Sequence, residues 1–291
     1  MDNYTIMEKI GKGTHGTVYL LKSKEEKKYV VCKSVLNKFK SHAYREILIL
    51  SKLNHRRVTK LIDSIIFKDS IFIILEYINY GSLESMISFF YKNTIFPHPN
   101  IGWAVISQIS DALCYIHSKD IIHRDIKPSN ILISKFYVKE KEFLEFKLCD
   151  FSLSVKNAGF ISDGHTVGTP YYMSPEMVGK IGYDSSIDCW GLGCCLYELL
   201  NLKKPFQGHT REELFGEIRA KEIVEDTTED SYLDEVIKSC LRKKDRVNSR
   251  ELVKNEKIRL NLAMQELKHK ESKIEELEKR ISELKQEKKL V

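Results

Sequence analysis

Apolar and polar positions alternate along residues 4–78 in the manner of β-strands. Three runs, 17–21, 29–35 and 71–75, are rich in β-branched and aromatic residues, which favours strands. Between the second and third runs, residues 43–53 carry apolar side chains at helical spacing and predict a single helix. The pattern therefore predicts a strand-rich N-terminal lobe.

Beyond this lobe the apolar spacing becomes helical from 83 to 200, most clearly at 101–117 and 187–200. A second change occurs near Leu252, after which the chain has neither Pro nor Gly and is dominated by Lys, Glu and Leu. The expected fold class is α+β, with two lobes followed by a C-terminal helix. The corresponding boundaries are 1–78 for the N-terminal lobe, 79–251 for the helical lobe and 252–291 for the C-terminal helix.

The C-terminal segment carries a heptad pattern that favours a coiled coil. In one register the a positions are Val253, Leu260, Leu267, Ile274 and Ile281, and the d positions include Ala263, Leu277, Leu284 and Val291. The same seam is interrupted by three charged residues, Glu256, Lys270 and Lys288, so a single solvated helix is the alternative. We expect a homodimer through this helix, and the flanking charges leave its orientation open.

The overall composition fits a globular protein inside the cell. The chain has 291 residues, 42% hydrophobic and 30% charged, which is enough for a sizeable core. Its formal charge of +6 permits an anionic ligand, but the basic tail residues are interleaved with acidic ones and do not indicate nucleic-acid binding. Seven cysteines without zinc-finger spacing indicate reduced thiols. With no signal peptide and no apolar run of about 18–20 residues, we expect a soluble protein with no membrane partner.

A glycine-rich stretch, GKGTHGTV, begins at Gly11 and has the glycine spacing of phosphate-binding loops. The same spacing opens dinucleotide-binding folds, but there a helix follows the third glycine, whereas the chain after Gly16 continues as a strand. The loop therefore favours a hairpin that lies over a nucleotide, with Val18 packing on the base.

Lys33 lies in the middle of a predicted strand, and Glu46 lies in the helix that follows it. Taken alone, each side chain would be interpreted as a surface residue. As a pair they have a function, because a lysine held by a carboxylate can point its ammonium group at the α- and β-phosphates of a nucleotide.

The segment HRDIKPSN, followed by a strand at 131–133, places charged residues between apolar flanks. Asp125 can accept a hydroxyl proton and orient a nucleophile, and Lys127 can neutralise charge on a transferred phosphoryl group. The amide oxygen of Asn130 can ligate a divalent ion. Asp150, at the end of a later strand, can hold Mg²⁺ against the β- and γ-phosphates. Together these residues indicate phosphoryl transfer.

With GTPYYMSPE at 168–176 and SIDCWGLGCCLYELL at 186–200, the chain resembles a eukaryotic protein kinase over residues 4–255. Lys127 and Thr169 match the Ser/Thr pattern, and these motifs together with the C-terminal heptads resemble the NIMA-related kinases. The resemblance implies the bilobal protein kinase fold, ATP and Mg²⁺ as cofactors, and Ser or Thr hydroxyls of proteins as substrates. It also implies a cell-cycle or microtubule-organising role in cytoplasm or nucleus, with the centrosome or spindle pole as a candidate location.

The resemblance also assigns roles to individual residues. The adenine would hydrogen-bond the backbone around 76–78, with Leu75 as the gatekeeper. The nucleotide-binding set is Ile10, Gly11, Lys12, Gly13, Gly16, Val18, Lys33, Glu76 and Ile78. A regulatory hydrophobic column would consist of Leu50, Leu61, His123 and Phe151. Glu176 would pair with Arg246 and brace the large lobe.

Regulation is expected in the segment between Asp150 and Glu176. In the family, Arg124 is placed to grip a phosphate from this segment. We expect Thr166 to be the activating phosphorylation site, with Ser162 second. In the same family pattern Thr169 hydrogen-bonds near the catalytic aspartate and lysine.

The chain departs from the family pattern at Ser152, where Asp-Phe-Ser replaces Asp-Phe-Gly. A serine would strain the active state by ~1–3 kcal/mol if its φ had to be positive. Because no functional group is lost, we interpret Ser152 as tuning the activity. The alternative is an inactive or ATP-binding pseudokinase that acts as a coiled-coil scaffold.

The neighbouring Cys149 is expected to line the nucleotide pocket and to react with cleft-directed electrophiles.

Overall fold

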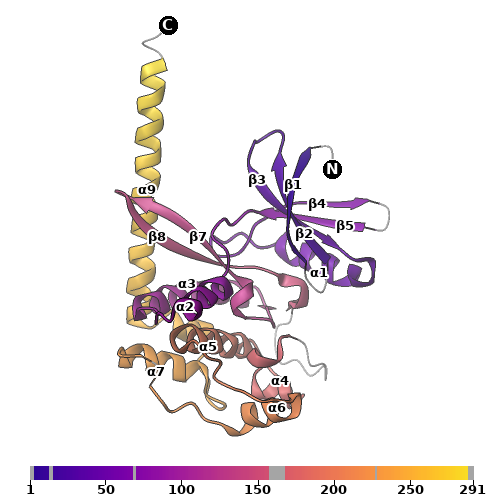
Figure 1. The fold of residues 1–291 in the computed structure, drawn as a ribbon, viewed down its shortest axis with the longest axis vertical. Helices are drawn as coiled ribbons and strands as arrows, with labels where there is room; N and C mark the ends of the chain where they lie inside the picture. The colour runs from indigo at the N-terminus through magenta and orange to yellow at the C-terminus, as the bar shows by residue number, and fades with distance from the viewer. Residues whose placement is uncertain (1–2, 13–15, 68–69, 157–167, 227, 288–291) are drawn as a thin grey trace.

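The computed structural model describes residues 3–12, 16–67, 70–156, 168–226 and 228–287 and has two lobes (Figure 1). The N-terminal lobe is a sheet with one helix, and the C-terminal lobe is mainly helical. This arrangement confirms the predicted α+β fold class. Within the described residues, no helix is both long enough and apolar enough to span a membrane.

The small lobe is built on one antiparallel sheet of five strands in the order β1-β2-β3-β5-β4. The strands are β1 (Tyr4–Lys12), β2 (Gly16–Ser23), β3 (Tyr29–Val35), β4 (Leu61–Phe67) and β5 (Ser70–Glu76). The runs predicted at 17–21, 29–35 and 71–75 are β2, β3 and β5. Helix α1 (Lys40–Leu50) follows a 3₁₀ turn (Asn37–Phe39) and contacts β4 and β5, so the helix expected at 43–53 begins and ends about one turn earlier.

The large lobe packs its helices around α3 and α5, whose inward faces include the buried indoles of Trp103 and Trp190. Its helices are α2 (Leu83–Asn93), α3 (Pro99–His117), α4 (Pro175–Val178), α5 (Ser186–Asn201), α6 (Arg211–Ala220), α7 (Ser231–Cys240) and α8 (Ser249–Leu252). The helical runs expected at 101–117 and 187–200 are α3 and α5. Three short 3₁₀ turns lie at Pro128–Asn130, Phe151–Leu153 and Pro170–Tyr172.

The large lobe also contains two small sheets of two strands each. Strand β6 (Ile121–Ile122) pairs with β9 (Val155–Lys156), and β7 (Ile131–Val138) pairs with β8 (Lys141–Leu148). The β7–β8 hairpin has eight residues in each strand, whereas the sequence analysis expected a strand only at 131–133. Its first and last residues directly adjoin the segments that contain Asn130 and Asp150.

The C-terminal segment is one long helix, α9 (Glu256–Glu287), which runs beside the β7–β8 hairpin and projects beyond it (Figure 1). Its first turns belong to the large lobe, because Ile258 is fully buried in the same hydrophobic cluster as α3 and α5. The predicted helix is therefore present, and its beginning is part of the core of the domain.

Candidate active site

An ion cluster joins the two lobes. The Lys33 ammonium group on β3 lies 2.8 Å from Glu46 Oε2 on α1 and 2.7 Å from Asp150 Oδ1 in the large lobe. Burial alone would lower the pKa of Lys33, but the two carboxylates raise it above its ordinary value. The lysine is therefore held charged, and it contacts both acidic partners that the sequence analysis assigned to the site.

The two carboxylates respond differently to this environment. Burial raises the pKa of the fully enclosed Glu46, although Lys33 opposes the change. Burial would also raise the pKa of Asp150, but the charge and hydrogen bond of Lys33, helped by the Ser152 N–H, hold it well below its usual range. Asp150 is therefore an ionised carboxylate at neutral pH.

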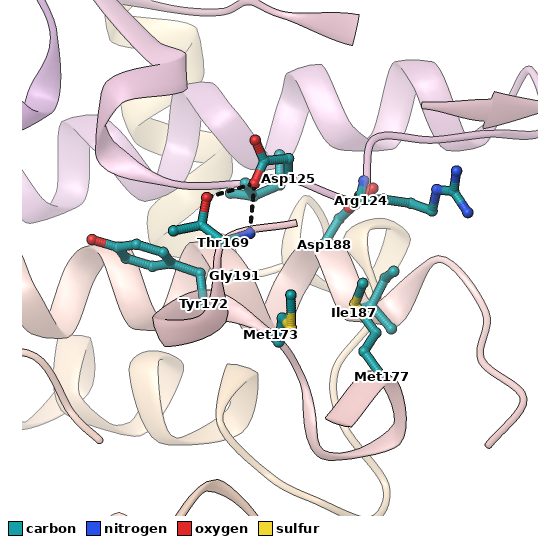
Figure 2. Close-up of a pocket in the computed structure, with 10 residues that line it drawn as sticks. Arg124, Asp125, Thr169, Tyr172, Met173, Met177, Ile187, Asp188 and Gly191 are labelled. Carbon is teal, nitrogen blue, oxygen red and sulfur yellow. Dashed lines mark hydrogen bonds between the residues drawn. The ribbon is translucent and has the colours of Figure 1, made fainter. Parts of the chain in front are cut away.

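A second network surrounds Asp125 (Figure 2). The Thr169 backbone N–H and hydroxyl group each donate to Asp125 Oδ1 at 3.0 Å, and Thr169 is turned toward the carboxylate in Figure 2. The Lys127 ammonium group lies 2.6 Å from Asp125 Oδ2 and donates to Thr169 Oγ1 at 2.9 Å. The Asn130 amide donates to the same Oδ2 at 3.1 Å. The four residues thus meet in one network, although Thr169 is remote from the others in sequence.

Asn130 and Asp150 lie on adjoining backbone. The Cys149 N–H donates to the Asn130 carbonyl oxygen at 3.0 Å, directly beyond the last pair of the β7–β8 ladder. The Asn130 side-chain nitrogen is used by Asp125, and Lys33 and Ser152 both approach Asp150 Oδ1. Within the described part of the chain, Asn130 Oδ1 and Asp150 Oδ2 accept no hydrogen bond. Two oxygen ligands are therefore available on neighbouring residues.

This donor set fits Mg²⁺. No group of three or more His, Cys, Asp or Glu residues in the described ranges could hold a metal by itself. Mg²⁺ does not need such a cage, since it is usually bound by one or two protein oxygens together with substrate phosphates and water. An ionised carboxylate beside an amide oxygen matches that mode of binding.

Asp188 on α5 anchors the loop that contains Asp125, a role that its place in the family motif at 186–200 does not by itself reveal. Its Oδ2 accepts from the His123 N–H at 2.8 Å, and its Oδ1 accepts from the Arg124 N–H at 2.9 Å. The His117 ring nitrogen Nε2 lies 2.8 Å from Oδ2. Burial would raise the pKa of Asp188, but the hydrogen bonds from His117 and His123 lower it. A buried aspartate at the start of an apolar helix was the available signal for this role.

The residues expected to stack behind the site share one cluster. Leu50, His123 and Phe151 are buried, and Leu61 packs against the same hydrophobic cluster. The rings of His123 and Phe151 meet edge to face with their centroids 4.8 Å apart. In the large lobe, Arg246 forms a bidentate ion pair with Glu176.

Arg124 is buried beside the site and points away from Thr169 (Figure 2). Its Nε donates to the Leu153 carbonyl oxygen at 2.8 Å, and its Nη1 donates to the Tyr183 hydroxyl group at 3.0 Å. The expected phosphorylation sites Ser162 and Thr166 lie outside the described residues. The contact with Tyr183 was not anticipated from the sequence.

Besides Lys33 on β3, the predicted nucleotide-binding residues that the structure describes lie along β1, along β2 and at or just beyond the end of β5. A Cβ atom at Gly16 would lie only 1.9 Å from the Ser34 carbonyl oxygen, so the close pairing of β2 with β3 already requires glycine there. Gly13 lies outside the described residues, while Ile10, Gly11 and Lys12 end β1 and Val18 lies on β2. Glu76 ends β5, with the partly buried Ile78 just beyond it and the gatekeeper Leu75 buried before it.

The Glu76 carboxylate is engaged by the large lobe. Lys147 on β8 donates to both of its oxygens, at 2.8 and 2.9 Å, and the Lys60 N–H donates to one of them at 2.8 Å. Nothing in the sequence singles out Lys147, because its partner lies 71 positions away. This ion pair occupies the Glu76 side chain, and the Glu76 N–H donates to the Lys60 carbonyl oxygen at 3.0 Å, so the predicted contact with adenine depends on the other backbone groups of residues 76–78.

Ser152 does not have the strained backbone that the sequence analysis considered. It lies inside a short 3₁₀ turn and is not among the residues with positive φ; the positive value, +61°, belongs to Asp150. The condition for strain at Ser152 is therefore not met.

Burial and the nearby Asp150 raise the pKa of the Cys149 thiol, which lowers its thiolate fraction and works against the expected reactivity with electrophiles.

Comparison with known proteins agrees with this geometry. The sequence profile of the protein kinase domain matches residues 4–286. The human serine/threonine-protein kinase Nek5 is 36% identical over 221 residues, which cover 74% of this chain and 30% of the relative. A probable serine/threonine-protein kinase nek2 of Dictyostelium discoideum is 34% identical over 231 residues, covering 75% and 53%. Mouse serine/threonine-protein kinase ULK3 is 32% identical over 231 residues, covering 77% and 47%. The chain thus spans about a third to a half of the length of these relatives.

Proposed function

Because the chain belongs to the protein kinase domain family and resembles its NIMA-related members, we propose that it transfers the γ-phosphoryl group of ATP to Ser or Thr hydroxyl groups of proteins. The observation that supports the proposal most directly is the contact of Lys33 with both Glu46 and Asp150. Phosphoryl transfer depends mainly on positioning and electrostatics, and this contact aligns groups from both lobes.

Each residue of the two networks has a task in this reaction. Lys33, held by Glu46, binds the α- and β-phosphates. Asp125 orients the substrate hydroxyl group and accepts its proton, while Lys127 stabilises negative charge on the transferred group. Thr169 fixes Asp125 through its two hydrogen bonds and thereby links the catalytic loop to the segment that receives the substrate.

Asn130 and Asp150 would hold Mg²⁺ through their free oxygens. Bound there with the nucleotide, the ion would supply charge neutralisation at the β- and γ-phosphates. The ion pair with Lys33 keeps Asp150 ionised and oriented for this role.

The replacement of Asp125 by Asn tests the function. It keeps the size of the side chain and removes the group that accepts the proton, so we expect phosphoryl transfer to fall at least about 10²-fold while ATP binding is retained. The assay measures transfer of labelled phosphate from MgATP to a generic Ser/Thr substrate, with ATP binding measured by calorimetry. ATP binding without transfer by the native chain would support the pseudokinase scaffold instead.

We propose in addition that the exposed apolar stripe of α9 forms a homodimer and that the protein acts in the cell cycle or in microtubule organisation. Support for the first comes from the heptad pattern together with the exposure of Leu267, Ile274 and Ile281 on α9. Support for the second is the similarity to NIMA-related kinases. Imaging of a tagged chain through the cell cycle tests the second proposal, and uniform distribution outside centrosomes and spindle poles would contradict it.

A further inference from the structure

The β7–β8 hairpin carries the proposed metal ligands at its base. Asn130 directly precedes β7, and Asp150 follows β8 after one residue, with the Cys149–Asn130 hydrogen bond between them. The register runs without a break from Ile131 opposite Leu148 to Val138 opposite Lys141. Because the ladder is continuous, a tilt of the hairpin changes the orientation of the two segments at its base.

The far end of the hairpin is a tight turn with an unfavourable backbone. Lys139 and Glu140 connect the strands and have φ values of +46° and +66°. Two positive φ values belong to the turn type that suits hairpins, but Asn and Gly are the residues that adopt them easily. A turn made of Lys and Glu therefore gains from a contact that holds it in place.

Helix α9 supplies that contact. Both carboxylate oxygens of Glu275 lie 3.2 Å from the Lys139 N–H, which donates to them at the turn. Earlier on the same helix, the His269 ring meets the Phe136 ring of β7 edge to face, with the ring centres 5.8 Å apart. The Lys268 ammonium group lies 4.0 Å from the ring centre of Phe143 on β8. Phe136 and Phe143 are themselves a cross-strand pair whose rings stack at 5.5 Å. The helix thus touches both strands and the turn.

The other end of α9 is fixed in the large lobe. Ile258 is fully buried in the core, and Lys257 forms an ion pair with Asp230 at 2.8 Å. The Lys257 ammonium group also lies 4.3 Å from the ring centre of Trp103 on α3. A helix held at its start by the lobe core and contacting the hairpin near its middle can transmit rigidity between them (Figure 1).

Beyond Lys257, which is at e in the first turn, the contacts with the domain named above lie on one face of α9. In the register that places Ile274 at a, Ile258 is at f, Lys268 and Glu275 are at b, and His269 is at c. The a positions Leu260, Leu267, Ile274 and Ile281 are instead 52–59% exposed. Docking within the chain and the proposed dimer therefore use different faces of the same helix.

We propose that α9 is a brace that positions Asn130 and Asp150 by holding the β7–β8 hairpin, and that Glu275 is a positioning residue for the metal site. The inference deepens the proposed function and rests on it. Loss of the Glu275 contact frees the turn and allows the hairpin to tilt, so it weakens binding of Mg²⁺ at a site remote from the substitution.

The test compares Glu275→Ala and Glu275→Gln, each made in the whole 291-residue chain, with the native chain. Calorimetry measures ADP binding at increasing Mg²⁺ concentrations, and the readout is the Mg²⁺ concentration at which its effect on ADP binding is half-maximal. The affinity for ADP in EDTA is measured alongside, as the value without metal. For Glu275→Ala we expect the Mg²⁺ concentration to rise about threefold to tenfold, in the range of known long-range couplings, with unchanged affinity in EDTA. Glu275→Gln keeps an oxygen that can accept from the Lys139 N–H, so it should restore most of the loss.

Glu276→Ala is the matched control, since it removes a carboxylate from the next position of α9, whose only recorded partner in the described chain is Lys273 on the same helix. This control should behave as the native chain does. An unchanged Mg²⁺ requirement in Glu275→Ala, or an equal change in Glu276→Ala, would overturn the brace. A native chain that binds ADP and Mg²⁺ but transfers no phosphate would instead contradict the proposed function and leave the brace to be judged by the binding data.

Discussion

At the scale of single residues, the site depends on charges that are brought out of water and paired. Lys33 remains charged in a buried position only because two carboxylates lie within 2.8 Å of its ammonium group. Removing Lys33 would leave two uncompensated carboxylates beside each other, which is far more costly than the loss of an exposed ion pair, whereas removing one carboxylate would leave Lys33 paired with the other. The network is therefore sensitive to single substitutions.

Ser152 offers the clearest residue-scale prediction. Because it lies at negative φ inside a turn and is buried, glycine would bring only additional backbone freedom, at a cost of about 0.5–1 kcal/mol to the ordered state. We expect Ser152→Gly to leave phosphoryl transfer unchanged or to lower it by up to about fivefold, as measured with MgATP and a generic substrate. A large gain in activity would show that the serine is an off switch.

At the scale of elements, the structure joins segments that the chain keeps apart. Asp188 on α5 holds the catalytic loop through its backbone N–H groups, and α9 holds the β7–β8 hairpin through contacts with its turn and its strands. The start of α9 is a structural part of the large lobe, since Ile258 belongs to its core. A truncation near residue 255 would therefore remove core packing as well as the heptads.

Two residues on α9 test this conclusion as a pair. Ile258 is fully buried, whereas Leu260, two residues later, is 58% exposed. We expect Ile258→Ala to lower the free energy of unfolding by about 2–5 kcal/mol, because it opens a cavity in the core. Leu260→Ala should change it by less than about 0.5 kcal/mol, as surface substitutions usually do. Urea denaturation measures both, and equal effects would contradict the assigned burial.

At the scale of the whole molecule, the proposed homodimer depends on the outward face of α9. Dimerisation there would bring a second kinase domain to high local concentration and favour autophosphorylation between copies. The face that docks on the hairpin would stay in place, because the a and d positions lie elsewhere on the helix.

Charge introduced into the seam tests the dimer. Ile274→Glu combined with Ile281→Glu puts glutamates at two a positions of each helix, where like charges of the two chains would meet in the seam. We therefore expect dissociation to monomers in sedimentation velocity runs at micromolar concentration. Autophosphorylation at nanomolar concentration should then slow by about tenfold or more. Lys279→Glu, which changes the net charge by the same amount outside the seam, should have neither effect. A native chain that is already monomeric would contradict the proposal.

Much of the site could be predicted from short stretches of sequence, because the chemistry of phosphoryl transfer restricts the residue types. Lys33, Asp125, Lys127, Asn130 and Asp150 were recognised by residue type and local setting, and the structure brings all five into two linked networks. Asp188 and Lys147 were not given roles, because an aspartate at the start of an apolar helix or a lysine in a strand can be noticed in the sequence, but nothing local names its partner.

The sequence by itself determined strands β2, β3 and β5, the long helices and the chemical groups of the site, because these follow from periodicity and from the residues that a reaction requires. Only the tertiary structure decided which face of α9 docks and which stays exposed. A heptad pattern reports that a helix has an apolar stripe, but it does not say what covers the opposite face. That depends on contacts such as those of Glu275 with Lys139, which lie 136 positions apart and exist only once the large lobe has folded.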